Sequence, residues 1–104
     1  MAKNFIEEIG FGAQGSTYAN QGSNAIKPPA GQVYVMIQMI TETTFSALTA
    51  ESPTTCVSTA GTGGGTNGAT LETVTFTKGM VIYGRWTSID ISNSGGSIIA
   101  YIAN

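Results

Sequence analysis

Histidine is absent from this 104-residue sequence, cysteine and tryptophan occur once each, and only 10% of the residues are charged. Histidine is the most common general acid or base in enzymes, and the six acidic residues are dispersed along the chain. A serine or threonine nucleophile would have only lysine as its base. These absences predict a protein that is not an enzyme and that has no catalytic residues and no cofactor.

The lone cysteine, Cys56, excludes an internal disulfide and cannot form a zinc site, so we expect no bound metal. The residues around it favour a strand. We therefore expect Cys56 to be a small buried hydrophobe rather than a reactive thiol.

Positive charge is also scarce. The four basic residues are scattered and the net charge is −2, so the sequence lacks the basic patch that nucleic-acid binding requires. No apolar run reaches the roughly 20 residues of a membrane span. Glu7 and Glu8 stand where a signal peptide needs its apolar core. We expect a protein made in a cytoplasm that contacts neither nucleic acid nor membrane.

Short runs of β-branched and aromatic residues, bounded by glycine, asparagine and serine clusters, dominate from residue 32 onward. They predict a meander of three strands at 71–77, 80–91 and 97–102. A further strand is predicted at 32–40, and another at 41–50, where a helical turn is the alternative. The sequence therefore predicts an all-β fold, a small antiparallel β-sandwich or jelly-roll-like barrel of roughly six to eight strands.

The strand predicted at 32–40 is apolar on both faces. Strict alternation places Val33, Val35, Ile37 and Met39 on one face and Tyr34, Met36, Gln38 and Ile40 on the other. A small sandwich normally leaves one face of a strand in water, so the second face requires a cover from the N-terminal segment or from another subunit. We therefore expect a homo-oligomer.

Residues 1–32 differ from the rest of the chain, because glycines punctuate them and no periodicity persists. We interpret them as an extended N-terminal arm before a β domain at 33–104. The G-x-G-x-x-G string at 10–15 is not followed by a helical pattern, which favours a flexible arm over nucleotide binding. A glycine-rich loop at 58–69 is expected to be flexible and exposed, because it has no side chain large enough to pack.

The residues at 83–87 are the most site-like in the chain. Their two aromatic rings could stack on a sugar, and Arg85 could hold a carboxylate. We favour a structural interpretation, in which Gly84 leaves room for the indole and Tyr83 and Arg85 point to solvent or to a subunit contact. The core face of this strand would then consist of Met80, Ile82 and Trp86.

Five segments carry a resemblance to a known family, at 11–19, 28–31, 43–51, 83–90 and 98–102. The most characteristic are Tyr-Gly-Arg-Trp-Thr-Ser-Ile-Asp at 83–90 and Ile-Ile-Ala-Tyr-Ile at 98–102. Together they resemble small virion structural proteins of tailed bacteriophages, notably those of marine bacteria and cyanobacteria. The resemblance covers nearly the whole chain and is weakest in the glycine-rich loop. It implies a capsid decoration, or cement, protein, and it transfers no catalytic or ligand residues.

We therefore expect a structural protein on the capsid surface of a virion, made in the host cytoplasm. It would bind between major capsid proteins as a homotrimer and stabilise the head. The expected subunit or shell interface comprises Phe5, Ile6, Ile9, Phe11, Tyr34, Met36, Tyr83 and Arg85. The alternative is a phage host-recognition or fibre-associated domain that binds a glycan through Tyr83, Arg85 or the glycine-rich loop.

Overall fold

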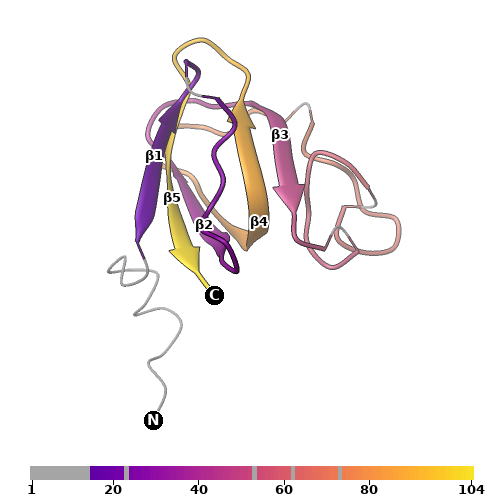
Figure 1. Cartoon of the computed structure of the whole chain (residues 1–104). Coiled ribbons are helices and arrows are strands. Elements are labelled where there is room, and N and C mark those ends of the chain that lie inside the picture. Colours follow the sequence, from indigo (N-terminus) through magenta and orange to yellow (C-terminus); the bar gives the residue numbers. More distant parts are fainter. Residues whose placement is uncertain (1–14, 23, 53, 62, 73) are drawn as a thin grey trace.

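The computed structural model describes residues 15–22, 24–52, 54–61, 63–72 and 74–104, which form one open antiparallel sheet (Figure 1). Its strands are β1 (Ser16–Asn20), β2 (Val33–Met39), β3 (Phe45–Ala50), β4 (Val81–Ile91) and β5 (Ser97–Ala103), in the order β1-β5-β2-β4-β3. The predicted all-β antiparallel fold is confirmed. A sandwich or jelly-roll-like barrel is not, because all five strands of the described residues lie in one sheet.

The predicted C-terminal meander is wrong in its order. β4 and β5 follow each other in the chain, but β2 lies between them and pairs with both. The connection from β4 to β5 therefore passes the end of β2, where the carbonyl of Ser97 accepts bonds from the N–H groups of Ile40 and Thr41 at 2.9 and 3.3 Å. β2 occupies the centre because both of its faces are apolar, and a central strand has both faces available for packing.

The strand predicted at 71–77 is also wrong. Among the described residues of that segment only Phe76 makes a strand-like contact, a bridge to Thr43 with both N···O distances at 2.9 Å. Leu71 instead donates its N–H to the carbonyl of Ser58 at 2.9 Å, within a turning chain. Phe76 is buried edge-to-face against Phe45, with ring centroids 5.5 Å apart. The apolar residue thus fills the core without belonging to a strand.

Part of the predicted arm belongs to the sheet. Residues 1–14, which include Phe5, Ile6, Ile9 and Phe11, lie outside the described residues. Residues 16–20, however, form β1 against β5, and Ala19 is buried in the core. Ile26 forms an antiparallel bridge to Ile89 of β4. Sequence patterns miss β1 because it is short and mostly polar, so only its partner strand specifies it.

A β-bulge at Val35 divides β2 into two parts with opposite side-chain alternation. The register shifts between Tyr34 and Met36 relative to both neighbouring strands. As a result Tyr34 packs in the same cluster as Ile37, whereas Val33 and Val35 pack with Met36. The strict alternation expected from the sequence is wrong before the bulge, because an extra residue reverses the phase of the pleat.

We call the face that carries Tyr34 and Ile37 the inner face and the opposite one the outer face. Parts of the chain between the strands cover the inner face, and the core there includes Ile26, Cys56, Val57, Leu71 and Phe76 from these connections (Figure 1). From the sheet itself the inner face contributes Ala19, Met39, Leu48, Trp86, Ile89, Ile98, Ala100 and Ile102.

The glycine-rich loop at 58–69 is only partly exposed. The N–H of Thr59 donates to the carbonyl of Leu48 in β3 at 3.1 Å. The N–H of Leu48 donates to Oγ1 of Thr59 at 3.0 Å. A Cβ added to Gly64 would lie 2.9 Å from the backbone nitrogen of Val57, so the chain passes too close there for a side chain. Residues 65–69 are exposed, as expected.

Trp86 of β4 binds the connection that follows β3 to the sheet through a hydrogen bond. Its indole is fully buried, and its Nε1–H donates to the carbonyl of Val57 at 2.8 Å. A Cβ on Gly84 would lie 2.6 Å from Cζ2 of Trp86 and 2.8 Å from Sγ of Cys56. The prediction that Gly84 leaves room for the indole is confirmed. Met80, predicted on the same core face, is instead exposed.

We predict that Gly84→Ala destabilises the protein, because the added methyl group overlaps the indole and the thiol, and overpacking costs about 1–3 kcal/mol. Gly65→Ala is the matched control, since no atom lies within 4 Å of a Cβ built there and its backbone is not left-handed. Denaturant unfolding should give a lower midpoint for Gly84→Ala and an unchanged one for Gly65→Ala. Equal midpoints would contradict the packing described.

Candidate functional site

A hollow of about 380 Å³ opens between β4 and the turn that follows β3. The turn forms because the carbonyl of Ser52 accepts the N–H groups of Thr55 and Cys56 at 3.2 and 2.9 Å. The hollow is lined by Val35, Glu51, Ser52, Thr55, Cys56, Val57, Tyr83, Gly84 and Arg85.

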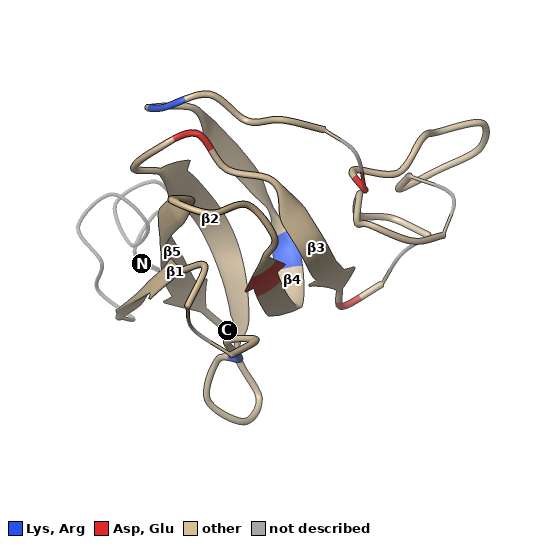
Figure 2. Cartoon of the chain, turned by 90° about the horizontal axis from the view of Figure 1, so that it is seen from above, with Lys and Arg blue, Asp and Glu red and all other residues tan. Residues whose placement is uncertain are grey.

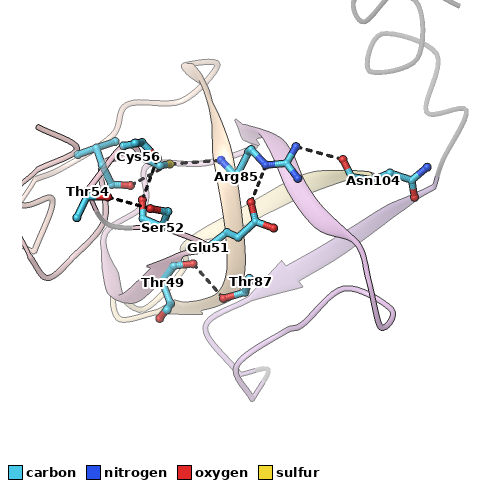
Figure 3. Close-up of polar contacts among 10 residues, drawn as sticks. Thr49, Glu51, Ser52, Thr54, Cys56, Arg85, Thr87 and Asn104 are labelled. Atoms are coloured by element: carbon cyan, nitrogen blue, oxygen red, sulfur yellow. Dashed lines mark hydrogen bonds and ion pairs between the residues drawn. The ribbon is translucent and has the colours of Figure 1, made fainter. Parts of the chain in front are cut away.

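Arg85 and Glu51 form an ion pair at this hollow, with 2.8 Å between Nε and Oε1 (Figure 3). Arg85 Nη1 also donates to the carbonyl of Asn104 at 3.1 Å, which ties the C-terminal residue to β4. The hydrogen bond from Arg85 lowers the pKa of the Glu51 carboxyl below its ordinary value, and the same bond raises the pKa of Arg85. Both side chains are about half exposed, so solvent screens the pair and its contribution to stability is small.

Cys56 connects the turn to β4 at Arg85. Its Sγ accepts a hydrogen bond from the backbone N–H of Arg85 at 3.3 Å (Figure 3), and it is half-buried against the core. The strand expected around Cys56 is wrong, because the bonds to Ser52 fold this segment into a turn. The thiol acts as a packing group and acceptor there.

The outer face carries a band of uncharged, mostly aromatic and aliphatic side chains across β1, β5, β2 and β4. The pairing register places Tyr83, Met36 and Tyr101 side by side in one row and Val81, Gln38, Ile99 and Tyr18 in the next. Tyr83 is 65% exposed and Tyr18 is 59% exposed, whereas the others are half-buried. We call these seven residues the outer-face band.

Charge is nearly absent from the strands. The only charged residues that fall on them are Arg85 and Asp90, both on β4, and the other charged positions of the described residues lie on connections (Figure 2). The outer-face band is therefore uncharged, and its border near the hollow is marked by the Arg85–Glu51 pair.

The structure places some of the predicted interface residues on the surface and one of them in the core. Met36 and Tyr83 are direct cross-strand neighbours on the outer face, and Arg85 lies beside them at the hollow. Tyr34, by contrast, is fully buried in the core of its own chain and donates its hydroxyl to Thr17 Oγ1 at 3.3 Å. Its burial raises the pKa of the phenol. The bulge turns Tyr34 inward, so the expectation of an interface role for it is wrong.

Two exposed or half-exposed aromatic residues, Tyr18 and Tyr101, were missed by the sequence analysis. Tyr18 lies in the segment interpreted as an arm, and Tyr101 alternates with inner-face residues of β5. Alternation along 97–102 was the signal that could have identified Tyr101. No comparable signal existed for Tyr18, because its strand has only one buried residue.

The guanidinium of Arg85 and the carboxylate of Glu51 at the hollow already satisfy each other. The described residues contain no group of three or more histidine, cysteine, aspartate or glutamate side chains placed to hold a metal ion. Within the same residues there is no helix long and apolar enough to cross a membrane.

We predict that Glu51→Gln slightly lowers the free energy of unfolding at neutral pH. The pKa of Glu51 is lower in the folded chain, so its contribution is present above the unfolded pKa and is lost as the pH falls through the folded one. The difference between the two proteins should therefore vanish in acid. Glu72→Gln, a change at an exposed acid away from the hollow, is the control. A difference that grows on acidification would refute the assignment.

A comparison of the chain with protein-family models, with curated proteins and with solved structures gives no match in any of the three. The resemblance to phage virion proteins therefore stays a prediction from the sequence.

Proposed function

We propose that this chain is a non-enzymatic structural protein of a virion, a decoration or cement subunit on the capsid surface. It binds between major capsid proteins, as a homotrimer at three-fold positions, and stabilises the head. The proposal starts from the resemblance of the segments at 83–90 and 98–102, which lie in β4 and β5. Residues Phe5, Ile6, Ile9 and Phe11 are retained in it as anchors to the neighbouring subunit or shell.

The observation that carries the proposal is the outer-face band. Tyrosine and methionine are enriched at protein interfaces, because they supply large contact areas and few charges that would have to lose water. The band contains three tyrosines and one methionine, and no charged residue. Such a face fits a flat protein surface better than a small ligand.

The composition of the remaining surface supports the same function. Only 10% of the residues are charged, so attachment would depend on apolar and hydroxyl contacts. Contacts of this kind are weakened little by salt, in contrast to exposed ion pairs. A cement subunit that acts by adding contact area is consistent with this balance.

We expect the purified protein to bind capsid shells that lack it, in a simple ratio to the major capsid protein, and to stay bound at high salt. Tyr83→Ser should weaken binding at least about tenfold, which corresponds to roughly 1.4 kcal/mol. Val74→Ser is the matched control, because Val74 is an exposed apolar residue outside the outer-face band. A handful of copies per particle would instead indicate a tail or fibre component.

A second candidate function, glycan binding by a host-recognition or fibre-associated domain, is favoured by one observation. Tyr83 is exposed and borders the hollow that also contains Glu51 and Arg85. An exposed aromatic ring beside an acid and a hydrogen-bond donor is the arrangement that holds a sugar ring, by stacking and by polar contacts.

The two functions differ in how strongly binding depends on the Arg85–Glu51 ion pair. For a glycan site, we expect Glu51→Gln and Arg85→Gln to abolish binding on an array of bacterial surface glycans, together with Tyr83→Ser. For shell attachment, the first two changes should leave binding within about threefold of the unmodified protein, because solvated rim pairs contribute little. Binding to the shell without any glycan signal would exclude the second candidate.

A further inference from the structure

The outer edge of β1 presents backbone groups that another extended strand can satisfy. Ile102 donates its N–H to the carbonyl of Gly15 at 2.9 Å, which fixes the phase of the β1–β5 ladder. With that phase, Thr17 and Ala19 direct their backbone groups toward β5, and Ser16 and Tyr18 direct theirs away from it. No strand among the described residues pairs with this outer edge.

The opposite edge of the sheet is closed. The backbone N–H and C=O of Leu48 in β3 are both hydrogen-bonded to Thr59. Those of Thr43, just before that strand, are both hydrogen-bonded to Phe76. A ring of copies joined head to tail, with β1 of one copy on β3 of the next, is therefore blocked. Among the described residues, edge pairing between copies is therefore left open only from β1 to β1.

β1 also lacks three of the features by which natural sheets protect an edge, namely charge, proline and a bulge. Its sequence, Ser-Thr-Tyr-Ala-Asn, contains no charge and no proline, and its pairing with β5 shows no bulge. Edges without lysine, proline or a bulge are templates for pairing with another strand. The adjacent outer-face band is uncharged as well, so a second copy would meet no like charge there.

We propose that β1 of one copy pairs antiparallel with β1 of a second copy, across a two-fold axis at Tyr18. In this register Tyr18 lies opposite Tyr18 of the second copy, and Ser16 lies opposite Asn20. Tyr18 is 59% exposed and lies on the outer face beside Ile99, so the two rings would meet as a cross-strand aromatic pair. The two sheets become one continuous sheet, and the two outer-face bands join.

This contact goes beyond the proposed function, because it joins two copies to each other and is tested without any shell. A homotrimer on the capsid could use it to connect to a neighbouring trimer. Failure of shell binding would leave it standing, and its own failure would leave shell binding untouched.

The first test is sedimentation of the full chain over a range of concentrations. We expect the largest species of the unmodified protein to halve in mass in Tyr18→Lys, with the dissociation constant of that step raised at least about tenfold. Val74→Lys is the control, since it places the same charge on an exposed apolar residue outside the outer-face band and away from the edge. It should leave the assembly unchanged.

The second test fixes the register. In a Cys56→Ser background, Tyr18→Cys should form a disulfide-linked dimer on mild oxidation, because opposed residues of a hydrogen-bonded antiparallel pair lie about 5.5 Å apart at Cα, within disulfide range. Val74→Cys, at an exposed residue outside the outer-face band, should not. A chain that stays at one mass at every concentration, equal effects of the two lysine variants, or equal cross-linking of the two cysteine variants would each overturn the proposal.

Discussion

The burial of Trp86 against Gly84 is the contact on which the rest of this structure depends. The indole fits because the glycine has no side chain, and its N–H holds the carbonyl of Val57 at 2.8 Å. That bond fixes the turn after β3 across the end of β4. This turn brings the Sγ of Cys56 within hydrogen-bond distance of the N–H of Arg85. It also forms one wall of the hollow. A side chain at position 84 would disturb the core and the hollow together.

The bulge at Val35 decides which side chains are available to a partner. One extra residue turns Tyr34 inward, where it is fully buried, and leaves Met36 beside Tyr83 on the outer face. The sheet thus keeps a packed inner face under its connections and an outer face that is apolar but partly exposed. Covering an apolar face removes area from water, which would favour the assembly proposed above.

The edges of the sheet lead to the same conclusion by a different route. Contacts from Thr59 and Phe76 occupy the β3 side, and the described residues leave the β1 side without a strand partner. An uncharged, partly exposed band and an edge without charge, proline or a bulge are liabilities for an isolated soluble domain. They become useful in a subunit whose contacts are made inside a larger assembly, and the few charged residues are consistent with that setting.

The sequence by itself determined the all-β class, the strands at 32–40, 80–91 and 97–102, and the role of Gly84, because local β propensity and a glycine before a buried indole are visible without partners. It also placed Tyr83 and Arg85 on the outside. It could not give the strand order, β1, the bulge at Val35 or the fate of Tyr34. Those depend on which strands pair and in what register, and pairing is decided by residues far apart in the chain. The segment at 71–77 makes the same point: its alternation suits a strand, but the connections above the inner face required Phe76 as core, and tertiary packing prevailed over local pattern.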